Sequence, residues 1–402
     1  MKQLQELLQV RKAKGYEIAN TKKVVMSGYK WVVPSQNSNK TYEVILRLDK
    51  SVCTCPDFVE RGLKCKHIFA VEITTSKQVN RDGTTTIVQT KKITYSQNWH
   101  AYDKSQIEEK DKFLELLGEL IETIPEPNYV FGRPKMPMRD LLFASALKVY
   151  TQFSLRRFSS DMRMAKDKGF IDNAPCYSMI SKFMRDEELM PLLQKLITLT
   201  ALPLRSVESQ FAIDSSGFRT TRFNEYCVEK HGIKKEHKFI KAHICIGTKT
   251  NVITAVKITD ENGADCPQFI PLSKETFESG FLIGEMTGDK AYSSRDNIGY
   301  IDQIGGTAFI PFKTNATGKP RGKSHKWRDM YHYYMLNRDE FMEHYHKRSN
   351  VESTFNMVKS KFNDSLKSTT PIAQFNELLL KLLCHNIVVV IHEQNEVNMR
   401  CA

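Results

Sequence analysis

Apolar residues recur along the chain with two different spacings. In the first 100 residues they mostly recur at every second position, which is typical of strands. Residues 22–49 predict two or three strands, and residues 42–49 alternate most regularly. Residues 65–73 predict a short helix, and residues 74–96 predict a hairpin or an extended connector. We therefore expect a small β-rich domain at residues 1–100.

The middle of the chain follows the helical period. Residues 107–124 predict an amphipathic helix, and the basic, proline-rich stretch at 132–137 predicts a joint, so residues 101–137 are expected to be a helix and linker. Residues 138–206 predict a helical region. Its segment 177–183 is a candidate second helix of a helix-turn-helix that binds DNA, although a bundle that only packs fits the same pattern.

The last part of the chain alternates between strand and helix patterns, which is typical of a mixed α/β sheet. We expect strands at 210–213, 223–228, 239–246, 252–259 and 307–312, and a run at 281–287 that leads to Asp289. We expect helices at 267–278, 296–304, 339–362 and 378–391, and a basic loop at 318–326. The fold class is therefore α/β over residues 207–393, followed by a tail at 394–402.

Composition and charge favour a polyanionic partner. The 402 residues carry a formal net charge of +13, with 41% hydrophobic and 26% charged residues, as in an ordinary globular protein. No run of 18 apolar residues predicts a membrane span, and the first residues do not read as a secretory signal. Nine cysteines, an odd number, fit reduced thiols in a cytoplasm.

Four residues near the N-terminus have the spacing of metal ligands. Cys53 and Cys55 flank one residue, and Cys65 and His67 flank another, so three thiolates and an imidazole fall within fifteen residues. Such a set fills the four positions of a tetrahedral, structural zinc site. Ordinary reduced cysteines are the alternative, but a complete ligand set between a predicted strand and a predicted helix favours zinc.

Three carboxylates follow elements of the predicted sheet. Asp214 comes directly after the strand at 210–213, Asp289 follows the run at 281–287, and Glu352 lies within the predicted helix. Three carboxylates from separate elements suit Mg²⁺ or Mn²⁺. The rivals, ranked lower because they lack that setting, are Asp260, Asp265 and Glu285.

Cations accompany Glu352 on its predicted helix. Tyr345, Arg348, Glu352 and Lys359 fall within roughly 60° of one another on a helix that turns by about 100° per residue. The stretch 313–361 holds eleven Lys and Arg against five Asp and Glu. A solvated charged face is the ordinary explanation of such a pattern, but its place beside the carboxylates favours contacts to DNA phosphates.

These residues resemble the DDE transposases of bacterial and archaeal insertion sequences. One branch of that family carries Tyr, Arg, Glu and Lys with spacers of two, three and six residues, as at Tyr345, Arg348, Glu352 and Lys359. The run from Asp289 to Tyr292 is similar to the Asp-x-x-Tyr at the second aspartate of the family. The resemblance covers about 141–393.

The resemblance implies a ribonuclease-H-like fold and a catalytic set. Asp214, Asp289 and Glu352 would hold two magnesium ions, while Tyr345, Arg348 and Lys359 would contact DNA. We add four cations of the basic loop as expected DNA contacts: Lys319, Arg321, Lys323 and Lys326. The cysteine and histidine pattern resembles the SWIM zinc finger, whose role here is expected to be DNA contact, with protein contact as the alternative.

The leading hypothesis is an active transposase that acts on double-stranded DNA at insertion-sequence ends. We expect it to self-associate on DNA and to have no membrane partner. Its expected location is a prokaryotic cytoplasm, at the nucleoid. Three other hypotheses stay open. They are a ribonuclease-H-like nuclease without strand transfer, a catalytically dead DNA-binding protein derived from a transposase, and a zinc-finger adaptor for proteins.

Overall fold

The chain forms two compact units. The computed structural model describes residues 2–27, 30–36, 38, 40–45, 51–76, 99–126, 131, 135–220, 239–319 and 325–400. One unit comprises Met1–Lys112, Leu202–Val207 and Val390–Ala402, and the other comprises Phe113–Ala201 and Glu208–Val389. Helices α4 (Trp99–Glu122) and α15 (Pro371–Arg400) contribute residues to both units.

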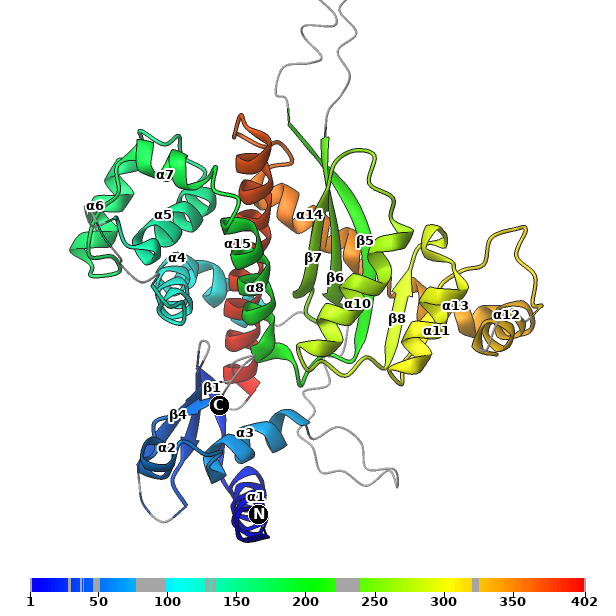
Figure 1. Cartoon of the computed structure of the whole chain (residues 1–402), viewed down its shortest axis with the longest axis horizontal. Coiled ribbons are helices and arrows are strands. Elements are labelled where there is room, and N and C mark those ends of the chain that lie inside the picture. The colour runs from blue at the N-terminus through cyan, green and yellow to red at the C-terminus, as the bar shows by residue number, and fades with distance from the viewer. Residues whose placement is uncertain are drawn as a thin grey trace, which may run out of the picture. The chain divides into compact units, whose positions relative to one another are not determined.

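The N-terminal unit contains a four-stranded antiparallel sheet in the order β1-β2-β3-β4 (Figure 1). Its elements are α1 (Lys2–Thr21), β1 (Val25–Ser27), β2 (Lys30–Pro34), β3 (Thr41–Ile45), β4 (Val52–Cys53), α2 (Pro56–Arg61) and α3 (Lys66–Ser76). The expected strands between residues 22 and 49 and the helix that carries His67 are confirmed. The expected hairpin at 74–96 lies almost wholly outside the described residues.

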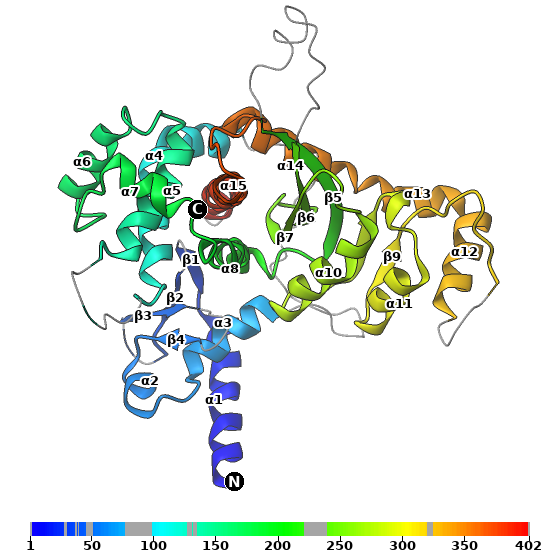
Figure 2. The same cartoon turned by 45° about the horizontal axis from the view of Figure 1, so that its top comes forward.

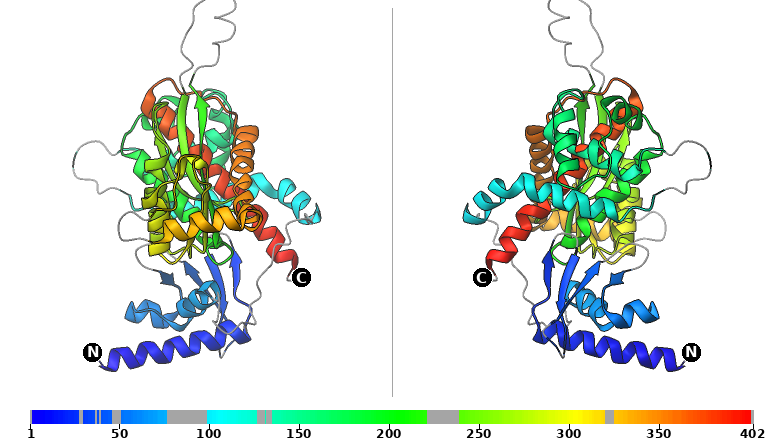
Figure 3. Two further views of the ribbon diagram at one scale, coloured as in Figure 1. Left: turned by 90° about the vertical axis from the view of Figure 1, so that its right-hand side faces the viewer. Right: turned by 90° about the vertical axis from the view of Figure 1, so that its left-hand side faces the viewer.

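Helix α1 was not expected, because its sequence is polar on most sides. Figure 3 shows it as a long blue helix beside α3. A Cβ atom at Gly15 would lie 2.6 Å from Cβ of Phe69 and 2.8 Å from the carbonyl oxygen of Lys66, so only glycine permits this close approach. Arg11 donates to Asp57 at 2.6 Å and to the carbonyl of Lys64 at 3.2 Å. Tertiary contacts therefore fix this helix where the hydrophobic pattern is weak.

The second unit is built on a five-stranded sheet in the order β7-β6-β5-β8-β9. Its strands are β5 (Gln210–Arg219), β6 (Phe239–Gly247), β7 (Ile253–Thr259), β8 (Glu285–Gly288) and β9 (Thr307–Phe309). Strands β5, β6 and β7 pair antiparallel, whereas β8 and β9 join parallel to β5. Three antiparallel strands continued by two parallel ones give the mixed, ribonuclease-H-like sheet that was expected.

Helices cover both faces of this sheet, with α10 in front of it and α14 behind it in Figure 1. Not all helices of this unit pack on the sheet; those between residues 138 and 362 are α5 (Met138–Thr151), α6 (Ser159–Asp167), α7 (Tyr177–Phe183), α8 (Leu189–Ala201), α10 (Phe269–Glu278), α11 (Arg295–Gln303), α12 (Lys326–Leu336), α13 (Arg338–His346) and α14 (Ser349–Phe362). Short 3₁₀ turns occur at Leu202–Leu204, Cys266–Gln268 and Lys290–Tyr292.

Helix α15 supplies the core of this unit, as the apolar stretch at 378–391 predicted. The Asn386 side chain donates to the carbonyls of Ile197 and Ile253 and accepts from the backbone of Ile253, which ties the helix to α8 and β7. Among the described residues this is the one helix long and apolar enough to cross a membrane, and 89% of its apolar window is buried within the protein.

Three expectations about the second unit are corrected. Strand β5 continues past Asp214 to Arg219, because all nine residues from Phe211 to Arg219 pair with β6. The single helix expected at 339–362 is two helices, α13 and α14, separated by a turn at Lys347 and Arg348. Residue Lys326, expected in a loop, begins α12. The strand expected at 223–228 lies outside the described residues.

Candidate functional site

Asp214 and Asp289 come from neighbouring parallel strands. Ile213 on β5 is in register with Gly288 on β8, so the residues that follow them lie side by side at the same level of the sheet. Beyond β8 the chain turns through Lys290–Tyr292, and the Asp289 carboxylate accepts the backbone N–H of Lys290 at 2.5 Å. Tyr292 is buried against Phe269 and anchors this turn.

Helix α14 brings the third carboxylate to the same place, since it packs along β5 (Figure 2). The Arg348 guanidinium lies at its start and joins Asp214 to Glu352. It donates to Asp214 at 2.5 Å and to Glu352 through a second nitrogen. Two carboxylates that are 138 residues apart in sequence therefore share one cation.

Two ion pairs join the turn before α14 to the sheet. Lys347 donates to Glu285 on β8 at 2.9 Å, while Arg348 reaches Asp214 on β5. The backbone N–H groups of Arg348 and Val351 bond to carbonyls three residues earlier, so the helical ladder is interrupted at this point. Tertiary ion pairs thus coincide with a break that helical periodicity did not predict.

The negative charges of the three carboxylates repel one another, and Arg348 offsets part of this repulsion. Burial raises the pKa of the Asp214 carboxyl, Arg348 opposes this shift, and the negative charges of Asp289 and Glu352 raise the pKa further. Mutual repulsion among three carboxylates favours a cation between them. The side chain of Arg348 is 19% exposed, whereas that of Glu352 is 58% exposed and open to a ligand.

The remaining residues of the expected stripe surround this cluster. The Arg348 guanidinium lies 5.8 Å from the centre of the Tyr345 ring, and burial raises the pKa of that phenol. Lys359 donates to Ser216 on β5 at 2.7 Å, and its ammonium lies 5.1 Å from the centre of the Phe218 ring. The structure therefore brings all four stripe residues to the β5 face, although two helices and the turn between them carry these residues.

The three rival carboxylates are engaged elsewhere. Asp265 accepts from Ser215 and pairs with Lys241, each at 2.7 Å. Glu285 pairs with Lys347 and His344, and Asp260 accepts the backbone N–H of Asn262. Ser215 and Ser216, which sequence reasoning did not single out, hold Asp265 and Lys359. The alternation of a strand that continues past Asp214 could have identified Ser216, because it shares the face of Asp214.

The expected contacts of the basic loop are partly described. The side chain of Lys319 is exposed, and its carbonyl accepts from Arg295 at 3.2 Å. Lys326 pairs with Asp302 at 3.0 Å. Arg321 and Lys323 lie outside the described residues.

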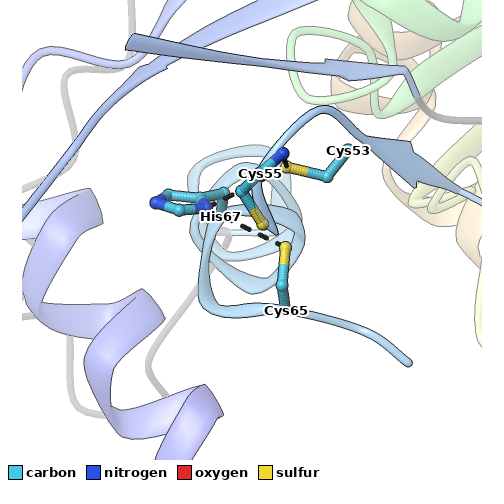
Figure 4. A group of neighbouring side chains, drawn as sticks. All are labelled: Cys53, Cys55, Cys65 and His67. Atoms are coloured by element: carbon cyan, nitrogen blue, oxygen red, sulfur yellow. Dashed lines mark hydrogen bonds between the residues drawn. The ribbon is translucent and has the colours of Figure 1, made fainter. Parts of the chain in front are cut away.

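The cysteine and histidine cluster forms a compact set of metal donors. One donor atom from each of Cys53, Cys55, Cys65 and His67 lies within 4.8 Å of the other three, and all four residues are buried. Figure 4 shows Nδ1 of His67 turned toward the sulfurs, with Sγ of Cys53 at 3.9 Å and Sγ of Cys65 at 4.0 Å. These spacings fit one tetrahedral zinc ion. The carboxylates form no such compact group, since Arg348 lies between Asp214 and Glu352.

Models of known protein families match the regions that contain the carboxylates and the cysteine and histidine cluster. Residues 205–387 match the family model of the transposase DDE domain, and residues 42–75 match the SWIM zinc finger. The chain therefore carries a transposase DDE domain behind a SWIM zinc finger. It is a DNA transposase, an enzyme of a class that uses Mg²⁺ or Mn²⁺ for cleavage and strand transfer.

One solved structure is also similar, a piggyBac transposase synaptic complex with hairpin DNA. The match covers 72% of this chain and 73% of that chain, at 12% identity and a TM-score of 0.37. A TM-score of this size does not establish a common fold.

Proposed function

We propose that Asp214, Asp289 and Glu352 are the catalytic carboxylates of this transposase, and that the enzyme hydrolyses and rejoins phosphodiesters at insertion-sequence ends. The observation that supports the proposal is the bridge that Arg348 forms between Asp214 on β5 and Glu352 on α14, next to the strand end that Asp289 follows. The DDE domain match spans all three positions.

The donor set fits divalent magnesium or manganese, since both ions prefer carboxylate oxygens. When bound, such ions activate the attacking oxygen and stabilise the leaving oxygen of an in-line displacement. Asp214, on a central strand, provides a rigid and half-buried ligand, while Asp289 and Glu352 reach the site from solvent-exposed positions.

The surrounding cations are proposed to hold DNA. Arg348 can exchange a carboxylate oxygen for a phosphate oxygen, because a guanidinium donates to either in the same geometry. Lys359 sits above Phe218 at the far end of α14, and Tyr345 stacks beside Arg348. We propose phosphate contacts for these three residues and for Lys319, Arg321, Lys323 and Lys326.

The carboxylate proposal predicts a specific loss of chemistry. Asp214→Asn, Asp289→Asn and Glu352→Gln should each abolish Mg²⁺-dependent cleavage of a duplex carrying the DNA that flanks the gene, while binding of that duplex survives. Asp260→Asn is the matched control, because Asp260 is exposed and its carboxylate accepts the backbone N–H of Asn262. A catalytic variant that still cleaves strongly would remove that residue from the site.

A second assay separates the transposase from a nuclease without strand transfer. A duplex with a preformed 3′-hydroxyl end should be joined to a supercoiled plasmid. Cleavage without any joined product would favour the nuclease, and binding without cleavage would favour a catalytically dead protein.

We further propose the arrangement in which the enzyme works. Residues 1–100 would form a zinc-finger domain, 101–137 a helix and linker, 138–206 a DNA-binding helical region and 207–393 the catalytic domain, with a tail at 394–402. The protein would self-associate on DNA, without a membrane partner, in a prokaryotic cytoplasm at the nucleoid. Sedimentation with and without the duplex tests the self-association.

A further inference from the structure

A groove that several cations line lies on the helical region, away from the carboxylates. It is a cavity of about 660 Å³ between α7 and the segment after α5. We call it the α7 groove. Tyr177 and Leu155 line it together with three cations and three serine hydroxyls: Arg156, Lys182, Arg185, Ser154, Ser178 and Ser181. No carboxylate is among its lining residues.

The three cations of the α7 groove are available to a ligand. None of them forms an ion pair with a described residue, and all three are exposed. The Arg156 guanidinium lies 5.5 Å from the centre of the Tyr177 ring, so the aromatic face holds it in place. Exposed cations are often only a solvated face. Here they converge on a hollow with hydroxyl donors, which is the set of groups that contacts DNA phosphates.

Two further cavities lie along the chain segment that borders the α7 groove. A second cavity of about 350 Å³ shares Ser154, Ser181 and Arg185 with the α7 groove and extends to Lys367. A third of about 390 Å³ shares no lining residue with the other two and is lined by Gln152, Lys359, Ser360, Asn363 and one carboxylate, Asp364. The three cavities therefore follow the segment 152–156 from α7 to the end of α14, where Lys359 contacts Ser216, two residues from Asp214 on the same strand face.

The wall of this path is held rigidly. Gln152 ends α5 in a left-handed conformation with φ of 58°, and its side chain donates to the carbonyl of Lys361 on α14. Buried Lys381 on α15 donates to the carbonyls of Asn363 and Ser365, each at 2.9 Å. A preformed polar surface loses little conformational entropy when it binds a ligand.

We propose that the α7 groove binds the sugar-phosphate backbone of double-stranded DNA and guides the duplex along α14 to the carboxylates. The occupant follows from charge, since a hollow lined by cations and hydroxyls and free of carboxylates suits a polyanion. Asp186, Glu187 and Glu188 follow Arg185 but do not line the hollow. The proposal deepens the proposed function and rests on it for the direction of the path.

The test measures DNA binding without chemistry, in full-length protein carrying Asp214→Asn. Arg156→Ala/Arg185→Ala should weaken binding of a fluorescent duplex and lower the salt slope of log K by about two, one for each lost phosphate contact. Lys182→Ala should lower it by about one. The matched control is Arg163→Ala/Lys166→Ala on α6, where two exposed cations lie outside the groove, and its slope should equal that of the parent.

Equal slopes for the groove and control variants would overturn the proposal. So would a change in self-association, seen by sedimentation, with an unchanged DNA slope, because the groove would then bind protein. These results are independent of the carboxylates. Cleavage by Asp214→Asn, with the groove slopes as expected, would reject the catalytic assignment and leave the groove standing.

Discussion

Arg348 controls the charge of the candidate catalytic site. It lies between Asp214 and Glu352, and its guanidinium occupies oxygens that a divalent cation would need. Sequence spacing could predict that Arg348 lies beside Glu352, because they are four residues apart. It could not predict the bond to Asp214, which depends on how α14 packs against β5.

This competition predicts that Arg348→Ala changes two equilibria in opposite directions. Mn²⁺ binding, measured by calorimetry or by electron paramagnetic resonance, should persist and become tighter, because the repulsion among the carboxylates is then relieved only by the metal. Duplex binding should weaken, with the salt slope falling by about one.

Lys359→Ala should lower the salt slope in the same way without tightening Mn²⁺ binding, because Lys359 bonds Ser216 and no carboxylate. Arg338→Ala, an exposed arginine on α13 that stacks on Tyr334, should change neither quantity. Weaker Mn²⁺ binding by Arg348→Ala would show that the arginine organises the carboxylates.

Elements with a strong hydrophobic pattern were predicted, and elements fixed by tertiary contacts were not. The buried strands β6 and β7 and the apolar core of α15 follow directly from apolar runs. Helix α1 depends on Gly15 and Arg11, and the break before α14 coincides with ion pairs to two strands. No local period carries such information, since it resides in partners distant in sequence.

A buried carboxyl supports one such tertiary contact, at the turn between β6 and β7. Glu208 accepts from the backbone and the hydroxyl of Thr250, each at 2.7 Å, and burial raises the pKa of this carboxyl from 4.5 to about 7 in spite of these bonds. The folded chain thus binds this proton more tightly than the unfolded chain does. The resulting stabilisation is complete below about pH 4.5 and is lost as the pH rises through about 7.

We expect the free energy of unfolding to fall by up to about 3 kcal/mol as the pH rises across this window, because Glu208 then loses its proton. Glu208→Gln should flatten that part of the pH profile, measured by chemical denaturation at a series of pH values. Glu278→Gln is the control, because Glu278 is an exposed partner of Lys274 and should leave the profile unchanged. A profile that stays steep in Glu208→Gln would assign the dependence to another group.

The chain as a whole joins two units that are stabilised in different ways. The second unit has a sheet covered by helices and a long buried helix, which together bury a large apolar core. The N-terminal unit has a small sheet, and its core cluster includes Cys53, Cys55 and Cys65. The ligand spacing in the sequence was sufficient to predict this cluster, because all four residues are close along the chain.

Zinc is therefore expected to stabilise the N-terminal unit selectively. Structural zinc contributes on the order of 10–16 kcal/mol to folding, which is comparable to the total stability of about 5–15 kcal/mol of a typical domain. Elemental analysis of protein purified without chelator should find one zinc ion per chain, and Cys65→Ser should lose it. In Cys65→Ser, the amides of β2, β3 and α3 should exchange their hydrogens faster, whereas the amides of β5 and β6 should stay protected. Cys176→Ser, at an exposed cysteine outside the cluster, should keep its zinc and its protection. A parent protein that lacks zinc yet protects the amides of β2 and β3 would show that the core of this unit folds without the metal.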